Sequence, residues 1–200
     1  MEVLAIVPAR GGSKRVPGKN WLEVGGQSLV AHAVRVAVEC HLYTYVVTDC
    51  PMQCYDLGKQ RGVTVMTEPI ELADDFTPMA QVLRWALDRS APVDYVCLLQ
   101  PTSPLRRARD VEGCLRVARE TGCDSVVTVT PRNRSVAGYI QHGFERNGAV
   151  YVVRPEILRD GDSCIGGHTV LYTMPPEVSV DVDTQQDLDE ARRLWKERMR

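Results

Sequence analysis

The stretch that indicates the fold is Val3-Leu4-Ala5-Ile6-Val7-Pro8, followed directly by Ala9-Arg10-Gly11-Gly12-Ser13-Lys14-Arg15-Val16-Pro17-Gly18-Lys19-Asn20. The short apolar run ending at Pro8 predicts a strand buried on both faces. In the loop, two adjacent glycines let backbone N–H groups approach an anion closely. The sequence therefore predicts a buried strand that leads into an anion-binding loop.

Four cations lie within this loop, and their density suits a triphosphate: Arg10, Lys14, Arg15 and Lys19. The loop is not a Walker A sequence, because the Gly-Lys-Ser/Thr ending is missing, and it is not a dinucleotide fingerprint either. The alternative interpretation is a solvated surface loop with a turn at Pro17-Gly18. Asn20, at the end of the loop, has the chemistry to bind a ribose hydroxyl or a base.

Apolar strand runs alternate with segments of helical period along the first 130 residues. This alternation predicts an α/β fold with a doubly wound, mostly parallel sheet, whose ligands bind beyond the carboxyl ends of the strands. We expect Asp110 to cap the fourth helix and Gly122 to end it. The expected strands are 3–7, 43–48, 64–66, 95–99 and 125–130, and the expected helices are 28–40, 51–61, 78–89 and 110–121.

The pattern loosens between residues 131 and 176, where we expect a small lobe within a single domain of residues 1–200. Further strands are expected at 149–153, 169–174 and 179–182. Thr184-Gln185-Gln186-Asp187 resembles a capping box, with Asp in place of the usual Glu, and predicts a final helix.

The composition of the 200 residues is that of a globular protein, with 44% hydrophobic and 25% charged residues. A formal net charge of -2 argues against a bulk nucleic-acid binder. We expect no secretory leader, no membrane span and, from the scattered spacing of seven cysteines, reduced thiols in a cytoplasmic protein.

Asp181 and Asp183 are two carboxylates separated by one residue. On a strand, residues i and i+2 face the same side, so both could bind one hard cation such as Mg²⁺. The alternative is a helix-entry cluster in which Asp183 or Thr184 is the cap.

Several blocks, in order, resemble the acylneuraminate cytidylyltransferases and, more distantly, the CMP-Kdo synthetases. They are the glycine-rich loop, Val47-Thr48-Asp49, Leu98-Leu99-Gln100-Pro101-Thr102-Ser103-Pro104-Leu105-Arg106, Asn147-Gly148-Ala149-Val150-Tyr151, and Asp181-Val182-Asp183-Thr184 with Asp187. The resemblance implies a Rossmann-like nucleotidyltransferase that transfers CMP from CTP to an acceptor with Mg²⁺ and releases pyrophosphate. It also implies a homodimer.

Carried over residue by residue, the resemblance gives Arg10, Lys19, Asp181 and Asp183 catalytic roles, the two aspartates as metal ligands. Gln100 matches an acceptor-side residue. The nucleotide-binding set is Ala9, Arg10, Gly11, Gly12, Ser13, Lys14, Lys19, Asn20 and Thr77. For an acceptor carboxylate or phosphonate, our own candidates are Arg132, Arg134 and Arg146, with ordinary surface charge as the alternative.

Three departures from the family bear on specificity. Glu68 stands where the family usually has an arginine that helps to hold the nucleotide. The segment between Val127 and Asn147 is short, so we expect a reduced dimerisation arm, and Gly166-Gly167 replace bulk in the expected sugar pocket.

We therefore expect a small acidic acceptor, such as phosphonoformate or a compact sugar acid. The alternatives are a CMP-sialic acid or nonulosonate synthetase, a same-fold enzyme using another nucleoside triphosphate, and a non-catalytic nucleotide-binding module.

Overall fold

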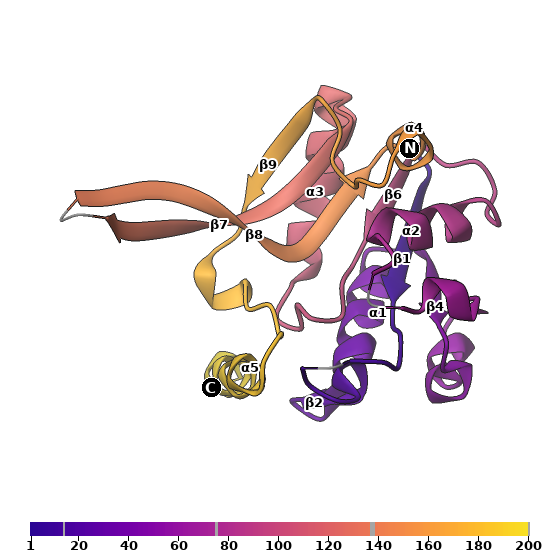
Figure 1. Cartoon of the computed structure of the whole chain (residues 1–200), viewed down its shortest axis with the longest axis horizontal. Coiled ribbons are helices and arrows are strands. Elements are labelled where there is room, and N and C mark those ends of the chain that lie inside the picture. The colour runs from indigo at the N-terminus through magenta and orange to yellow at the C-terminus, as the bar shows by residue number, and fades with distance from the viewer. Residues whose placement is uncertain (14, 75, 137–138, 200) are drawn as a thin grey trace.

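The fold is a seven-stranded sheet with helices on both faces (Figure 1). The computed structural model describes residues 1–13, 15–74, 76–136 and 139–199. For residues 133–136 and 139–142 it describes the backbone only. The strand order is β5-β4-β1-β6-β8-β7-β9. Only β8 runs opposite to the other six strands of this sheet, since it pairs antiparallel with both β6 and β7. The prediction of a doubly wound, mostly parallel α/β sheet is confirmed.

The strands are β1 Val3–Pro8, β2 Glu23–Val24, β3 Gln27–Ser28, β4 Tyr43–Thr48, β5 Val63–Thr67, β6 Tyr95–Leu98, β7 Ser125–Val136, β8 Tyr139–Val153 and β9 Thr169–Thr173. The α-helices are α1 Leu29–Glu39, α2 Met79–Leu87, α3 Ala108–Thr121, α4 Pro155–Asp160 and α5 Gln185–Arg198. Short 3₁₀ turns are η1 Lys19–Trp21, η2 Pro51–Cys54, η3 Leu57–Lys59, η4 Ile70–Leu72 and η5 Pro176–Val178. Strands β2 and β3 form a separate two-stranded ladder.

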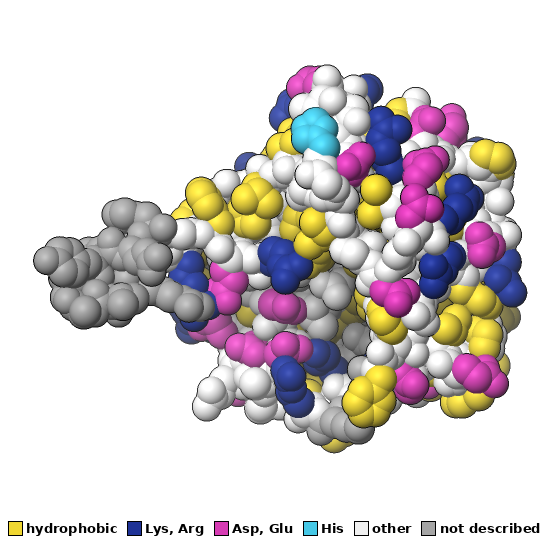
Figure 2. All heavy atoms as spheres, turned by 45° about the horizontal axis from the view of Figure 1, so that its top comes forward, with side chains coloured by type: hydrophobic (Ala, Val, Ile, Leu, Met, Phe, Trp, Pro, Cys, Tyr) yellow, Lys and Arg dark blue, Asp and Glu magenta, His cyan; other side chains and the backbone are white. Residues whose placement is uncertain are grey.

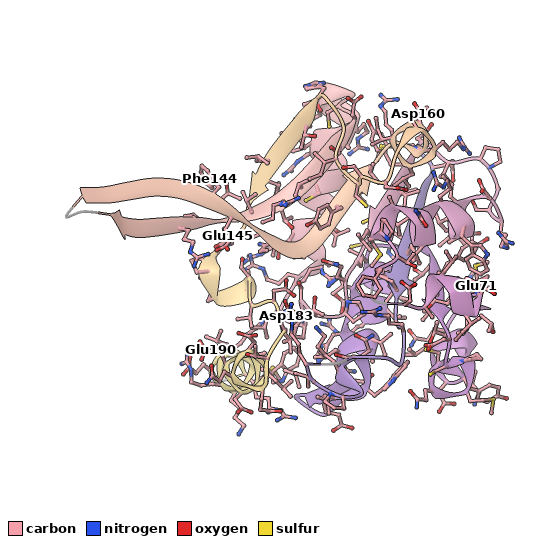
Figure 3. All side chains as sticks on the ribbon, in the orientation of Figure 1. Glu71, Phe144, Glu145, Asp160, Asp183 and Glu190 are labelled. Carbon is pink, nitrogen blue, oxygen red and sulfur yellow. The ribbon has the colours of Figure 1, made fainter. Side chains whose placement is uncertain are left out.

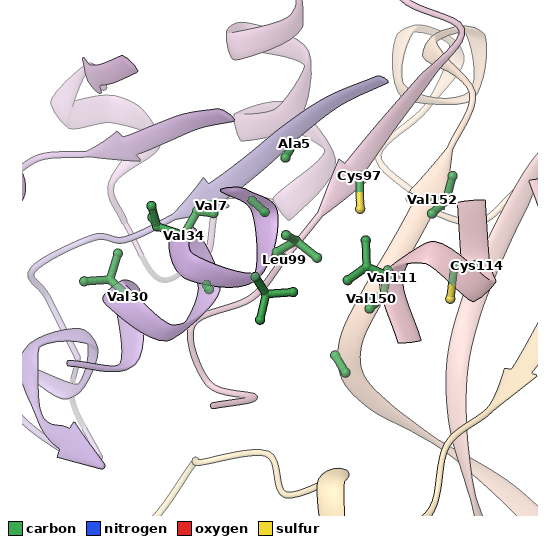
Figure 4. Packing of buried hydrophobic residues seen from close by; sticks show 14 of the residues in the cluster. Ala5, Val7, Val30, Val34, Cys97, Leu99, Val111, Cys114, Val150 and Val152 are labelled. Carbon is green, nitrogen blue, oxygen red and sulfur yellow. The ribbon is translucent and has the colours of Figure 1, made fainter. Parts of the chain in front are cut away.

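The sheet separates two apolar layers, because successive residues of a strand face opposite sides. In β1, Ala5 and Val7 pack under α1 and α3, whereas Leu4 and Ile6 pack under α2 and α4. Figure 4 shows the α1/α3 layer, in which helix residues meet the sheet residues Ala5, Val7, Cys97, Val150 and Val152 and also Leu99, which follows β6. Burial on both faces explains why β1 and β6 are continuous apolar runs.

Local capping follows the sequence closely. Thr184 Oγ1 accepts from the Asp187 amide and Asp187 Oδ2 accepts from the Thr184 amide, which is the expected capping box of α5. Gly122 ends α3 in the left-handed region at φ 61°. Asp110 differs in detail: the N-cap position is Arg107, and Asp110 accepts from the Arg107 amide from inside the first turn.

Two expected elements are wrong. Residues 51–61 form the separate turns η2 and η3 in place of a helix, and residues 179–182 follow η5 without forming a strand. Gly58 is one physical reason in the first case, because a helix-destabilising glycine interrupts the segment. In the second case, the Val182 amide donates to the carbonyl of Thr102 (2.7 Å), which lies in the turn after β6. This single bond to a turn does not make residues 179–182 part of a strand ladder.

The reduced lobe expected at 131–176 is more regular than predicted. Strands β7 and β8 continue past residue 130 as a long antiparallel hairpin, paired from Val129↔Arg146 to Val136↔Tyr139. Figure 1 shows this hairpin projecting from the body of the molecule. The segment that we expected to be a reduced arm therefore has the form of a two-stranded arm.

All seven cysteines are free thiols. Over the described residues, no helix has the length and apolar character that crossing a membrane requires. Figure 2 shows basic and acidic side chains interspersed over one face of the molecule.

Candidate active site

A cleft of about 380 Å³ lies at the carboxyl edge of the sheet. It is bounded by the loop after β1, the segment after β5, the first residues of α2, the turn after β6 and the segment before α5. The cleft brings together residues that are far apart in the chain. The predicted site residues that line it are Arg10, Gly12, Ser13, Lys19, Asn20, Thr77, Gln100, Asp181 and Asp183.

The glycine-rich loop is held against the end of β4. The Gly11 amide donates to Asp49 Oδ1 (2.6 Å), and a Cβ on Gly11 would lie 2.5 Å from the Cys50 sulfur. A side chain at this position would force the Cys50 thiol to move. Ala9 also differs from expectation: its side chain is buried in the core and its amide donates to the Val47 carbonyl, so it supports the loop from behind the cleft.

Basic side chains of the loop converge on Asp183. Lys19 Nζ lies 2.9 Å from Asp183 Oδ1, and Arg15 Nη1 lies 3.1 Å from Asp183 Oδ2. Lys19 is mostly buried, with 14% of its side chain exposed, whereas Arg15 is 73% exposed. Lys19 is therefore a positioned, partly desolvated positive charge for an anion that binds in the cleft.

Arg10 and Asn20 are joined through the backbone of the loop. The Asn20 side-chain amide donates to the Arg10 carbonyl (2.9 Å), and Arg10 Nη1 donates to the Asp74 carbonyl on the opposite wall. The first contact holds the two ends of the loop together, and the second ties the loop to the segment after β5. Lys14, which we also expected to bind the nucleotide, lies outside the described residues.

Asp181 and Asp183 face the cleft although they are not on a strand. Val182 between them is fully buried against Leu188 and Ala191, so its two neighbours point the other way. Asp181 is turned toward Gly148, where a Cβ would lie 3.0 Å from Asp181 Oδ2 and 2.9 Å from Gln100 Oε1. Gly148, at φ +68°, therefore lets two predicted site residues approach each other.

Asp181 carries a buried oxygen, Oδ1, with no hydrogen-bond partner among the described residues. Burial raises the pKa of Asp181, an effect that the Thr102 hydroxyl opposes. Divalent cations such as Mg²⁺ take carboxylate oxygens as ligands, and the unpartnered oxygen of Asp181 beside the Asp183 carboxylate is such a ligand set. The described residues offer no cluster of three or more His, Cys, Asp or Glu side chains, so the pair fits a cation that also takes ligands from a substrate and water.

The turn after β6 rests on a buried arginine. Arg106 is 1% exposed, and its Nη2 donates to the carbonyls of Gln100 and Ser103. Burial lowers the pKa of Arg106 to about 10, while the nearby Asp110 and Asp181 carboxylates oppose that shift. This guanidinium fixes the position of Gln100 at the rim of the cleft.

Glu68 lines the end of the cleft beside β5 and is 6% exposed. Burial raises the pKa of Glu68 to about 7; the Asp49 carboxylate adds to the shift and Arg10 opposes it. From the sequence, Glu68 was only a departure from a family pattern, whereas in the structure its side chain lines the cleft.

Thr77 belongs to a loop organised by Asp74. The Asp74 carboxylate accepts from the backbone amides of Phe76 and Thr77 and from the Thr77 hydroxyl. These contacts hold the pKa of Asp74 below its usual range. Thr77 lines the cleft, but its hydroxyl also supports the loop.

Two of the three arginines proposed for the acceptor, Arg132 and Arg146, do not line the cleft. Arg132 pairs with Glu145 on the projecting hairpin, and Arg146 is exposed on β8 near Tyr151. The side chain of Arg134 lies outside the described residues. Gly166 also does not open a pocket: its Cβ would lie 2.3 Å from Asp124 Cβ, so a close approach of two loops explains this glycine.

Sequence reasoning missed residues that complete the walls and supports of the cleft. Thr102, Leu72, Met79 and Val82 line it, and Asp49 and Asp74 hold its loops. Asp49 had a signal, because it follows a predicted strand in a block that resembles the family. The apolar residues had none, since an apolar face of α2 is equally expected to pack into the core.

A larger hollow of about 750 Å³ lies among α1, α3 and α5, with Arg107, Arg109 and Arg198 beside Glu39, Glu177 and Glu197. Among its described lining residues there is no member of the predicted site. Its mixed charges are typical of a solvated surface between helices, so the chemistry is assigned to the smaller cleft.

The model of the cytidylyltransferase family matches residues 4–162, which include most of the cleft. The chain belongs to the cytidylyltransferase family. The family model ends before Asp181 and Asp183, so the role of this pair is argued from geometry.

Two curated relatives illustrate the range of this cytidylyltransferase family. The chain is 27% identical to N-acylneuraminate cytidylyltransferase of Streptococcus agalactiae over 94% of its own length and 52% of the relative's. It is 32% identical to CMP-N,N'-diacetyllegionaminic acid synthase of Legionella pneumophila over 80% of its own length and 69% of the relative's. The chain thus spans about half the length of the first of these relatives.

The fold of this cytidylyltransferase family member matches solved structures over its whole length. A CMP:2-keto-3-deoxy-manno-octonic acid synthetase complexed with CTP has a TM-score of 0.79, at 18% identity, and covers 99% of this chain and 100% of its own. At that identity the likeness establishes the fold alone.

Proposed function

We propose that the chain transfers CMP from CTP to an acidic acceptor and releases pyrophosphate, in a Mg²⁺-dependent reaction. The observation that carries the proposal is the convergence of Lys19, Asp181 and Asp183 in one cleft of a cytidylyltransferase-family fold. A triphosphate needs positive charge for its β- and γ-phosphates, and the loop supplies it through Arg10, Arg15 and Lys19.

The chain's own residues position the reactants. Lys19 and Arg15 would exchange Asp183 for phosphate oxygens when CTP binds, and this exchange would leave Asp183 beside Asp181. Mg²⁺ held by the two carboxylates would supply charge neutralisation at the α-phosphate and the leaving group. Gln100, held by Arg106, would orient the acceptor at the side of the cleft near Asp181.

The acceptor is proposed by class. A nonulosonate-type sugar acid is supported by the names of the two relatives. A small acid such as a phosphonate is the second candidate, and the modest cleft of about 380 Å³ supports it.

The test is pyrophosphate release with CTP and Mg²⁺ against a panel that contains N-acetylneuraminate, 3-deoxy-octulosonate, phosphonoformate and shorter keto acids. We expect release with CTP and at least one of these acids, and little with ATP, GTP or UTP. The ratio of kcat/KM between N-acetylneuraminate and phosphonoformate decides the acceptor class, a tenfold ratio being about 1.4 kcal/mol of transition-state binding. If purified chain binds CTP no better than the other three nucleotides, the proposed function is wrong.

A further inference from the structure

The residues that line the cleft follow one another in the order of the strands of the sheet. Glu68 directly follows β5, Arg10 follows β1, Gln100 follows β6, and Asp181 lies against Gly148 of β8. Because the strand order is β5-β4-β1-β6-β8, these residues are met in that sequence along the carboxyl edge. The cations and the carboxylate pair thus occupy the middle and the β8 end, and Glu68 stands at the β5 end.

The β5 end has the character of a site for a flat, largely apolar group. Leu72, Met79 and Val82 line the cleft there, and Val82 is 5% exposed. Binding pockets combine such apolar walls with a few placed polar groups that fix the ligand's orientation. In a nucleotide whose phosphates lie against the cationic loop and the carboxylates, the nucleobase is the part that reaches this end.

Glu68 is the polar group placed in these walls. Its backbone amide donates to the Thr48 carbonyl (3.0 Å), which fixes the residue against β4. The residue is 6% exposed and lines the cleft. The titratable and charged groups that face it are Asp49 and Cys50 after β4 and Arg10 after β1, and Asp74 lines the same cleft. Met79 and Val82 of α2 add no charge on their side.

We propose that Glu68 recognises the nucleobase, and that its neutral carboxylic acid pairs with cytosine by donating to ring N3 and accepting from the 4-amino group. The inference rests on the proposed function, because it requires a cytidine nucleotide in the cleft. A neutral carboxylic acid offers one donor and one acceptor side by side, and the edge of cytosine offers the matching acceptor and donor. An ionised carboxylate loses the donor and sets a negative charge against N3.

The surroundings of Glu68 favour the neutral form. Burial and the neighbouring Asp49 raise the pKa of Glu68 to about 7, and a bound base would remove further water from it. The neutral form is therefore populated below neutrality and is lost as the pH rises above about 7. CTP affinity should fall over the same interval. A glutamine at this position keeps one donor and one acceptor at every pH.

The experiment is calorimetric titration of CTP into the intact chain at about pH 6, 7 and 8, for wild type, Glu68→Gln, Glu68→Ala and Glu71→Gln. Glu71 is the matched control, since it is an exposed glutamate three residues away on η4 (Figure 3). Inorganic tripolyphosphate is titrated in parallel, because it reports on the phosphate end without a base. Comparing variants at each pH cancels the titration of CTP itself.

We expect the CTP affinity of wild type to fall about tenfold more between pH 6 and pH 8 than that of Glu68→Gln, which is about 1.4 kcal/mol. Glu68→Ala should bind CTP at least tenfold more weakly at pH 6 while tripolyphosphate binding changes less than twofold, and Glu71→Gln should follow wild type. Equal pH dependence in wild type and Glu68→Gln overturns the neutral-acid pair, and so does loss of CTP binding in Glu68→Gln. Unchanged CTP binding in Glu68→Ala overturns base recognition altogether. Wild type that binds tripolyphosphate but not CTP overturns the proposed function, and the role of Glu68 with it.

Discussion

Lys19 and Asp183, 164 positions apart in the chain, form an ion pair in which Lys19 Nζ lies 2.9 Å from Asp183 Oδ1. The pair joins the anion-binding loop after β1 to the segment that enters α5, where Figure 3 labels Asp183. A cation and a carboxylate with these positions can separate to take a phosphate and a metal ion respectively.

Lys19→Ala should weaken CTP binding at least tenfold and CMP binding much less. The reason is that Lys19 is expected to meet the β- or γ-phosphate, which CMP lacks. The two dissociation constants are measured by calorimetry on each variant. Lys59→Ala is the matched control, because Lys59 is a 60% exposed lysine paired with Asp56 outside the cleft. Equal losses for CTP and CMP would assign Lys19 to the ribose or the base.

Asp181→Asn should abolish pyrophosphate release while the chain stays folded. The asparagine keeps the size of the side chain but removes the charge needed for a metal ion, and it also removes a buried carboxylate. We therefore expect a melting temperature at least equal to that of wild type at about pH 8, where a carboxylate with a raised pKa is ionised at a cost. Asp189→Asn is the control, since Asp189 lies on the exposed face of α5. Retained turnover at limiting Mg²⁺ would contradict the metal role.

Gly148→Ala should lower both stability and activity. The new Cβ meets Gln100 and Asp181 at about 3 Å at a backbone position of φ +68°. Gly26→Ala isolates the backbone contribution, because Gly26 has φ +79° and nothing within 4 Å of its built Cβ. We expect both variants to lose about 1 kcal/mol of folding free energy to the positive φ. Only Gly148→Ala should lose turnover as well, measured at a temperature where both variants are folded.

Glu68→Gln should stabilise the fold at alkaline pH and not at acidic pH. The pKa of Glu68 is raised from 4.5 to about 7, so the native state binds more protons than the unfolded chain between those values. Stability from this group is full below about pH 4.5 and is lost as the pH rises through about 7. The variant lacks the ionisation, so its advantage in free energy of unfolding should approach about 1–3 kcal/mol near pH 8. Denaturant unfolding of both proteins at about pH 5 and pH 8 measures it, and an advantage that does not grow with pH would contradict the buried carboxylate.

The chain should be a homodimer, with the β7–β8 hairpin as part of the interface. Phe144, labelled on that hairpin in Figure 3, is 62% exposed, and an exposed aromatic side chain on a projecting arm suits a partner surface. Light scattering at micromolar concentration measures the mass of wild type and Phe144→Glu. We expect a dimer that the substitution weakens. A wild-type monomer would reject the expectation.

The sequence by itself determined the elements whose residues carry local signals. Apolar runs identified β1 and β6, and helical periodicity identified α1 and α2. The Thr184–Asp187 box and Gly122 defined helix ends through backbone hydrogen bonds within a few residues. The glycine-rich loop and the two aspartates were recognisable because their chemistry and spacing are compact. Signals of this kind survive without knowledge of the fold because the interacting groups are neighbours in the chain.

Only the tertiary structure decided how the site is assembled and what surrounds it. Asp181 and Asp183 face the cleft because buried Val182 anchors the segment between them, and not because the segment is a strand. The length of the β7–β8 hairpin, the exclusion of Arg132 and Arg146 from the cleft and the burial of Glu68 all depend on strand order and packing between distant segments. A residue's charge and chemistry are written in the sequence. Its desolvation and its partners depend on segments that can lie far away in the chain, as the contact of Lys19 with Asp183 illustrates.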